Sequence, residues 1–155
     1  VHDYTADHSL VHGPHIDLRM TRASALNIIP TSTGAARATG LVLQAMNGKL
    51  DGTSLRVPIP DGSITDFTAV LSATPTVDEI NSAFASAASK APLAGILSYS
   101  EDPLVSADIV GDPSSCVFDA GLTMTMENLV KVSGWYDNEW GYSNRLVDLV
   151  GITCS

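Results

Sequence analysis

Polar residues able to move protons crowd the first eight positions of the chain. They are His2, Asp3, Tyr4, Thr5, Asp7 and His8. An imidazole changes charge near neutral pH and can act as a general base, and His2 is the candidate because it lies on a probable strand. Such a cluster is unusual at a free terminus, where chains tend to fray. Because the chain also begins with Val1 rather than Met, we expect it to be processed or part of something longer.

The histidines also suggest a metal site. His12 and His15 are spaced so that two imidazoles could lie together, as zinc sites need. However, no cysteine accompanies them, and the spacing matches no known ligand pattern. Histidine clusters identified from composition alone are weak indicators. We therefore expect no metal.

A run of hydroxyl residues and a glycine precedes a predicted helix at residues 30–36, Pro-Thr-Ser-Thr-Gly-Ala-Ala. Free backbone N–H groups and the helix dipole at such a start bind anions, above all phosphate. The alternative is ordinary capping of the helix by Ser32 or Thr33. Thr33 and Gly34 are therefore candidates for an anion site, with capping as the commoner use of these residues.

Arg56 lies in an apolar strand without an acidic neighbour in sequence. Its guanidinium could hold a phosphate or a carboxylate through two parallel hydrogen bonds. The alternation of faces along a strand could equally turn the side chain into solvent.

Aromatic and acidic residues join a predicted strand to a predicted helix at residues 135–143, Trp-Tyr-Asp-Asn-Glu-Trp-Gly-Tyr-Ser. Asp137 or Asn138 could cap that helix within an aromatic-packed turn. Alternatively, Asn138 could hydrogen-bond a ligand amide. The chemistry of the residues alone favours the cap.

Hydrophobic periodicity predicts the elements that position these groups. Residues 5–22 are expected to form a long loop, and loops of that length are usually functional or disordered. Helices are expected over residues 35–46, 76–88 and 141–150, the second with a capping box formed by Thr76 and Glu79. A strand or a short turn is expected over residues 23–30. Strands are expected over residues 55–59, 64–71, 96–99, 116–119, 122–126 and 129–135, with hairpin turns at 61–62 and 127–128. Few helices and many hairpin-linked strands predict an α+β fold. We expect a largely antiparallel mixed sheet of about seven to eight strands, with about three helices packed on one face.

Composition limits the class of protein. The 155 residues carry 8 Lys and Arg against 17 Asp and Glu, a formal net charge of −9. This negative charge argues against a nucleic acid or an anionic membrane as partner, because proteins that bind either one carry a surplus of Lys and Arg. A hydrophobic content of 45% excludes a disordered chain, and the length supports one domain.

No apolar run approaches the roughly 20 residues needed to span a bilayer, and no signal-peptide pattern opens the chain. Cys116 and Cys154 give no disulfide framework and no zinc spacing, so we expect structural cysteines and a cytoplasmic protein.

Four of these motifs resemble one known family. They are Val-His-x-Tyr-Thr at residues 1–5, Asn-Ile-Ile-Pro-Thr-Ser-Thr-Gly-Ala-Ala at 27–36, Leu-Arg-Val-Pro at 55–58, and the aromatic stretch at 135–143. In this order and near this spacing they resemble the C-terminal, catalytic half of the phosphorylating D-glyceraldehyde-3-phosphate dehydrogenases. The resemblance runs from residue 1 to about residue 152 and implies one catalytic and tetramerisation domain over residues 1–155. It implies the NAD-dependent conversion of glyceraldehyde 3-phosphate and inorganic phosphate to 1,3-bisphosphoglycerate in glycolysis.

The resemblance also implies a role for each matching residue. His2 would be the base that draws the proton from a cysteine thiol, which attacks the aldehyde, and it would then assist hydride transfer to NAD. Thr5 and Arg56, with Asp7 holding the arginine, would bind the phosphate of the substrate. Thr33 and Gly34 would bind the attacking inorganic phosphate. Asn138 would hold the nicotinamide carboxamide, with Tyr142 nearby. The loop from Thr5 to Arg22 would reach a neighbouring subunit, which implies a homotetramer.

The chain departs from the family pattern in several places. Many bacterial members have two arginines where this chain has Arg19 and Met20, and the second assists phosphate binding, so Arg19 alone is left as a candidate there. His8 replaces a frequent glutamine, and Pro14 resembles the NAD-preferring members. These 155 residues contain neither the NAD-binding Rossmann half, with its Gly-x-Gly fingerprint, nor the Cys-Thr-Thr-Asn-Cys segment of the nucleophile. We therefore expect the chain alone to be inactive.

Two alternatives to this function are open. Erythrose-4-phosphate dehydrogenases are related, but they usually lack the Thr-Gly-Ala-Ala run that includes Thr33 and Gly34. A fragment could also act only as an oligomerising or surface-binding module, without catalysis.

Overall fold

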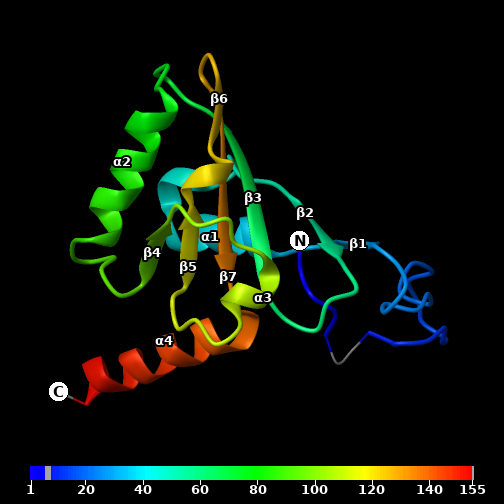
Figure 1. The fold of residues 1–155 in the computed structure, drawn as a ribbon. Coiled ribbons are helices and arrows are strands. Elements are labelled where there is room, and N and C mark those ends of the chain that lie inside the picture. The colour runs from blue at the N-terminus through cyan, green and yellow to red at the C-terminus, as the bar shows by residue number, and fades with distance from the viewer. Residues whose placement is uncertain (6–7, 155) are drawn as a thin grey trace. The chain divides into compact units, whose positions relative to one another are not determined.

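The computed structural model describes residues 1–5 and 8–154, and it divides the chain into two compact units, Val1–Pro60 and Asp61–Ser155. The described residues form four α-helices and seven strands, which confirms the α+β class (Figure 1). The expected single sheet of about seven to eight strands is confirmed only in part, because the seven strands are divided between two sheets. In the part of the chain that is described, no helix has the length and apolar character needed to cross a membrane.

The first unit is built on two antiparallel strands, β1 (Ile29–Ser32) and β2 (Thr53–Arg56). Between them lie α1 (Ala35–Val42) and a short 3-10 helix, η1 (Gln44–Met46). The helix predicted over residues 35–46 is therefore largely confirmed, with an interruption at Leu43, whose ψ of 84° leaves the helical region. Residues 23–30, predicted to form a strand or a short turn, contain a turn at residues 24–26, and only their last two residues belong to β1.

The loop predicted over residues 5–22 contains no helix or strand where it is described, from residue 8 onward. Its backbone is nevertheless tied together. Gly13 N–H donates to the carbonyl of Thr21 at 3.0 Å, and Ser24 N–H donates to the carbonyl of Ser9 at 3.0 Å. These bonds hold the described loop as a folded segment of the first unit.

The second unit contains a five-stranded sheet in the order β3-β7-β5-β4, with β6 beside β7. The strands are β3 (Ser63–Val70), β4 (Leu97–Ser100), β5 (Cys116–Asp119), β6 (Met124–Met126) and β7 (Leu129–Tyr136). Every recorded pairing is antiparallel except that of β4 with β5. The β6–β7 turn at Glu127 and Asn128 is confirmed, whereas the hairpin predicted at Asp61-Gly62 is wrong. β2 pairs with β1 and β3 pairs with β7, because Pro58 and Pro60 cannot donate to a ladder and β2 ends before them.

The core of the second unit lies between its sheet and α2 (Val77–Ala88). The predicted capping box starts this helix: the Thr76 hydroxyl accepts from Glu79 N–H at 3.2 Å, and the Glu79 carboxylate accepts from Thr76 N–H at 2.8 Å. Phe84 on α2 stacks on Phe118 of β5, with ring centroids 4.0 Å apart. Burial of this apolar face fixes α2 on the sheet.

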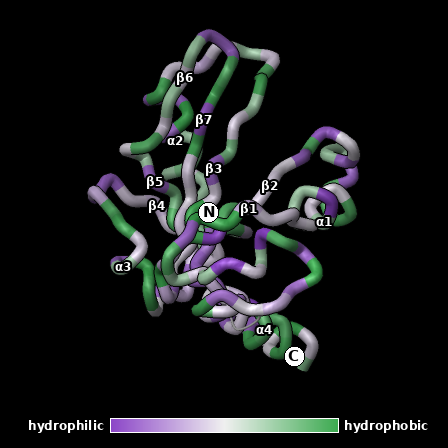
Figure 2. The backbone as a smooth tube through the Cα atoms, turned by 90° about the vertical axis from the view of Figure 1, so that its right-hand side faces the viewer, coloured by the Kyte–Doolittle hydropathy of each residue, from purple (hydrophilic) through white to green (hydrophobic). Residues whose placement is uncertain are grey.

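Two further helices complete the second unit. The sequence did not predict α3 (Ser106–Ile109), whose single turn is too short to show a helical period. The last helix, α4 (Asn138–Thr153), starts three residues before the predicted position and follows directly on β7. Hydrophobic residues recur along α4 to its C-terminal end (Figure 2), and several of their side chains are exposed. The expectation of three helices on one face is thus only partly confirmed, since α1 belongs to the first unit.

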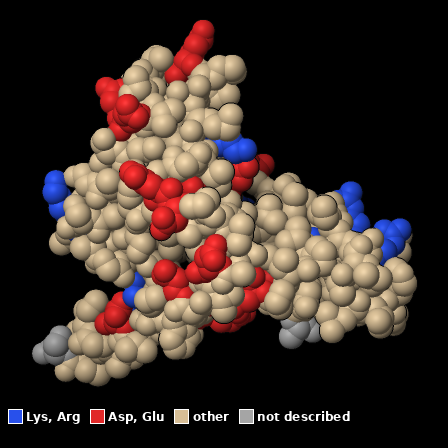
Figure 3. Space-filling view, viewed as in Figure 1, with Lys and Arg blue, Asp and Glu red and all other residues tan. Residues whose placement is uncertain are grey.

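The surface shows the excess of acidic over basic residues that the composition predicts. On the face shown in Figure 3, the side chains of Asp and Glu gather in several groups and outnumber those of Lys and Arg.

Candidate functional site

His2 is held beside β2 by backbone hydrogen bonds. His2 N–H donates to the carbonyl of Leu55 at 2.8 Å, and Val57 N–H donates to the carbonyl of His2 at 2.9 Å. The two bonds form an isolated parallel bridge between His2 and Arg56, so the predicted strand at His2 is reduced to a single bridged residue. Two motifs far apart in sequence, the Val-His start and the Leu-Arg-Val-Pro strand, are therefore joined in one place.

The environment of His2 keeps its ring neutral. Burial, the positive charge of Arg56 and the chain's own α-amino group together lower the pKa of His2 from 6.5 to about 4. Burial contributes most, because an imidazolium loses hydration there. A neutral imidazole carries a lone pair that can accept a proton, which is the requirement for a general base.

Arg56 is partly buried, and its guanidinium is anchored to the chain start. Its Nη1 donates to the carbonyl oxygen of Asp3 at 3.1 Å, and Asp3 is only 4% exposed. The solvated orientation considered for Arg56 is therefore not what the structure shows. A guanidinium held by one nitrogen keeps other N–H groups with which to bind an anion.

Thr5 is hydrogen-bonded to His8. The Thr5 hydroxyl and His8 Nδ1 are 2.9 Å apart, and His8 N–H donates to the carbonyl of Thr5 at 2.9 Å. Thr5 and His8 are therefore held together by a side-chain and a backbone contact. Asp7, the predicted partner of Arg56, lies outside the described residues.

Thr33 and Gly34 stand at the start of α1. The Thr33 hydroxyl accepts from Ala35 N–H at 3.2 Å, but α1 has no side-chain cap on its N-cap residue, so the alternative that Ser32 or Thr33 is the N-cap is wrong. Gly34 is the N-cap residue, and a Cβ built on it would meet nothing within 4 Å. In the strand register, Arg56 lies opposite Ile29, whereas Thr33 follows the other end of β1. The sheet therefore separates these two candidate anion ligands.

Arg19 lies in an exposed turn of the loop. Its N–H donates to the carboxylate of Asp17 at 2.9 Å, and Asp17 N–H donates to Nδ1 of His15 at 2.9 Å. Among the described residues, no recorded contact joins Arg19 to Arg56. Its role in phosphate binding stays a prediction.

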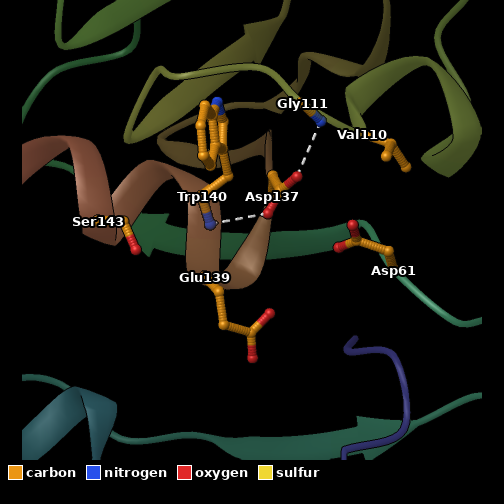
Figure 4. A pocket seen from close by; sticks show the side chains of 7 residues that line it. All are labelled: Asp61, Val110, Gly111, Asp137, Glu139, Trp140 and Ser143. Carbon is orange, nitrogen blue, oxygen red and sulfur yellow. Dashed lines mark hydrogen bonds between the residues drawn. The ribbon is translucent and has the colours of Figure 1, made fainter.

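The second unit carries Asn138 and Tyr142 on the first turns of α4. The predicted cap is confirmed: the Asp137 carboxylate accepts from Trp140 N–H at 2.9 Å. Asn138 is the first residue of the helix, and Tyr142 is 66% exposed one turn later. The helix start borders an open cavity of about 450 Å³, drawn in Figure 4, that is lined by Asp61, Val110, Gly111, Asp137, Glu139, Trp140 and Ser143.

Comparison with protein families decides which group of proteins these motifs belong to. The model of the glyceraldehyde 3-phosphate dehydrogenase C-terminal domain matches residues 1–138. The chain belongs to this family. The prediction made from the four motifs is thereby confirmed.

Individual relatives of this dehydrogenase domain are close in sequence. The chain is 60% identical over 98% of its length to glyceraldehyde-3-phosphate dehydrogenase of Mycolicibacterium smegmatis and 61% identical over 97% to that of Mycobacterium tuberculosis. It is 61% identical over 96% to glyceraldehyde-3-phosphate dehydrogenase 2 of Streptomyces avermitilis. In each case it covers 44% of the relative, so the chain spans less than half the length of these curated proteins.

One part of this dehydrogenase domain was not recognised from its sequence. Carboxylate oxygens of Asp61, Asp137 and Glu139 lie within 4.8 Å of one another at the start of α4 (Figure 4). Such oxygens could contact a cation, but both oxygens of Asp137 already accept N–H bonds, from Trp140 and from Gly111. No periodicity or motif could reveal the group, because Asp61 is brought to the helix start only by the fold.

Proposed function

We propose that this chain is the C-terminal, catalytic part of an NAD-dependent, phosphorylating glyceraldehyde-3-phosphate dehydrogenase. The parent enzyme oxidises glyceraldehyde 3-phosphate and adds inorganic phosphate to yield 1,3-bisphosphoglycerate. The observation that carries the proposal is 60% identity over 98% of the chain to an enzyme of that name. In the proposal, residues outside this chain supply the nucleophilic cysteine and the Rossmann domain that binds NAD.

His2 is the base of the proposed reaction. Because its pKa is lowered to about 4, the ring is neutral at pH 7 and can take the proton of the cysteine thiol as the sulfur attacks the aldehyde carbon. The bridge to Arg56 supports the proposal, since it holds the backbone of His2 next to that of the residue that would bind the substrate, and the positive charge of Arg56 acts on the His2 ring. Orientation of this kind lowers the entropic part of the barrier.

The residues proposed to bind anions offer positive charge, a hydroxyl group or backbone N–H donors. Arg56 and Thr5 bind the phosphate of the substrate in the proposal, and Asp7 and Arg19 assist. Thr33 and Gly34 bind the attacking inorganic phosphate. Gly34 leaves room for close approach to the backbone, and the N-terminus of α1 adds positive potential.

The start of α4 fits a nicotinamide ring by the chemistry of its donor set. The side-chain amide of Asn138 can donate to and accept from a carboxamide, and the exposed ring of Tyr142 lies one helical turn away. Bound there, NAD would supply the hydride acceptor. The contribution of this chain is orientation of the ring through Asn138.

The proposal includes a homotetramer in the cytoplasm. The loop after His8 exposes four large hydrophobic side chains, those of Leu10, Val11, Ile16 and Leu18. Exposure of several such groups on one segment favours a contact with another subunit. Cys116 and Cys154 are free, as suits a reducing compartment.

The proposal is tested with a fusion protein in which the N-terminal part of the Mycolicibacterium smegmatis relative precedes Val1. NADH absorbance should rise with glyceraldehyde 3-phosphate only when inorganic phosphate is present. His2→Asn should lower kcat by about 10²–10⁴-fold, the usual contribution of a general base. Arg56→Gln should raise KM for the aldehyde, while Arg145→Gln, which removes an arginine paired with Asp148, should not.

Three outcomes would contradict parts of the proposal. Unchanged NADH production by His2→Asn would exclude His2 as the base. Faster turnover of erythrose 4-phosphate would favour the related dehydrogenase. A folded, oligomeric fusion without NADH production would favour the non-catalytic, oligomerising alternative.

A further inference from the structure

Asp137 does more at the start of α4 than cap a helix. Its side chain is buried, with the residue 5% exposed, and its two carboxylate oxygens have different partners. One accepts from Trp140 N–H in the first turn of α4 at 2.9 Å, and the other accepts from Gly111 N–H at 2.8 Å, in the turn after α3 (Figure 4). A single carboxylate thus connects two segments that are far apart in sequence.

Asn138 lies inside the ring that the cap closes. The bond from Trp140 N–H to Asp137 spans residues 137–140, and Asn138 is the first residue of the helix within that span. Fixing both ends of this short segment restricts the backbone dihedrals of Asn138. The bond to Gly111 then fixes the whole segment against the body of the second unit.

A second contact shows that the helix start is seated closely on the same part of the unit. Gly141 follows one turn after Asp137, and a Cβ built on it would lie 2.7 Å from the carbonyl oxygen of Ser114. The first turn of α4 therefore packs directly on the backbone of residues 114–115. Packing of this kind leaves the position of Asn138 dependent on residues 111–115.

We infer that Asp137 is the positioning residue for Asn138, and that it sets the affinity of the enzyme for the nicotinamide end of its cofactor. The inference rests on the proposed function, in which Asn138 binds the carboxamide. Asp137 acts only through Asn138, and its charge strengthens both hydrogen bonds relative to a neutral acceptor.

The decisive substitution is Asp137→Asn. The amide has nearly the same volume, but only its oxygen can accept, so its NH2 group would face one of the two N–H donors. We expect KM for NAD in the fusion protein to rise about tenfold, the effect of losing one charged hydrogen bond of ordinary strength. KM for glyceraldehyde 3-phosphate should not change. Asp137→Ala should raise KM for NAD further, because the cap is lost as well.

Asp119 provides a matched control. It is also buried, at 4% exposure, and its carboxylate also accepts two N–H groups, from Trp135 Nε1 at 2.9 Å and Gly121 at 3.1 Å. Asp119→Asn should therefore lower the thermal midpoint of unfolding as Asp137→Asn does, but leave KM for NAD unchanged. A purely structural role of Asp137 predicts the same kinetics for both variants.

A readout independent of turnover is amide hydrogen exchange. Exchange at residues 138–140 and at Gly111 should accelerate in Asp137→Asn, and remain slow in Asp119→Asn. The inference would be overturned by an unchanged KM for NAD in Asp137→Asn, or by amide exchange no faster than in Asp119→Asn. The proposed function would still stand in that case, provided that the unmodified fusion protein forms NADH. An unmodified fusion protein that neither binds NAD nor forms NADH would refute the proposed function, and the inference would fail with it.

Discussion

Replacing Gly141 with alanine should destabilise the second unit, although alanine is the better helix former. Gly141 is buried in the first turn of α4, and a Cβ there would lie 2.7 Å from the carbonyl oxygen of Ser114 and 3.8 Å from the Cα of Ser115. Both neighbours are backbone atoms, so no side chain can rotate away. Either the helix or residues 114–115 must move.

The magnitude is the difference of two effects. Alanine gains about 1 kcal/mol of helix propensity over glycine. Overpacking of a well-packed contact costs about 1–3 kcal/mol, and displacement of the helix start also strains the bond between Trp140 and Asp137. Gly141→Ala should therefore lose up to about 2 kcal/mol of unfolding free energy. Gly151 in the same helix is the control: its Cβ would meet nothing within 4 Å, so Gly151→Ala should gain up to about 1 kcal/mol.

The assay is urea unfolding followed by tryptophan fluorescence. Both tryptophans, Trp135 and Trp140, belong to the second unit, so the signal reports on the unit that is changed. With a slope of about 1–3 kcal/mol per molar urea, the midpoints of the two variants should differ by about 1 M. A Gly141→Ala variant as stable as Gly151→Ala would refute the close approach of α4 to residues 114–115.

Four further predictions concern other parts of the chain. In Arg56→Gln, the pKa of His2 measured by an NMR titration should rise from about 4 but stay below 6.5, because burial is the larger cause; a value unchanged by the substitution would exclude the guanidinium as a cause. Because the pKa of His2 is lower in the folded chain than its ordinary value of 6.5, the free energy of unfolding is highest above pH 6.5 and falls as the pH is lowered towards 4. In urea unfolding, His2→Asn should lose less free energy of unfolding over that pH range than the unmodified protein. Thr76→Ala should cost about 1 kcal/mol in the same measurement by removing the cap of α2, whereas Thr76→Ser should cost little; equal losses would exclude the hydroxyl as the cause. Glu127→Gly should gain about 1 kcal/mol because Glu127 has a φ of 55°, and a loss of stability would contradict that assignment.

Elements with strong local determinants could be predicted from the sequence. The α2 helix has a capping box and a repeating apolar face, and β5 was located at its observed residues, 116–119. The errors occurred where long-range pairing decides. Asp61-Gly62 has the composition of a hairpin turn, but β3 finds its partner in β7, far along the chain, so the local signal was misleading. The division into two sheets is likewise a property of pairing that periodicity does not contain.

The candidate site was predictable where a motif carries its own chemistry. His2, Arg56 and Thr33 were proposed as site residues from their residue type, and the structure adds that His2 and Arg56 are bridged and that Thr33 lies at the other end of β1. The proximity of Asp61 to Asp137 and the bond from Gly111 to Asp137 could not be predicted. They join segments that are distant in sequence and whose side chains, taken singly, look like ordinary turn residues.

The neutrality of His2 does not depend on the chain beginning at Val1. The α-amino group is the smallest of the three causes that lower the pKa of His2, and burial and Arg56 come before it. In a longer chain a peptide bond would replace that amine, and the pKa would rise by the smallest contribution alone. Burial and Arg56 would still hold it below the ordinary value of 6.5, so the ring would remain a proton acceptor at pH 7. A weaker depression would also make the imidazole a stronger base, since basicity follows pKa. Burial and Arg56 thus keep His2, the proposed base, unprotonated at pH 7, whether or not further residues precede Val1.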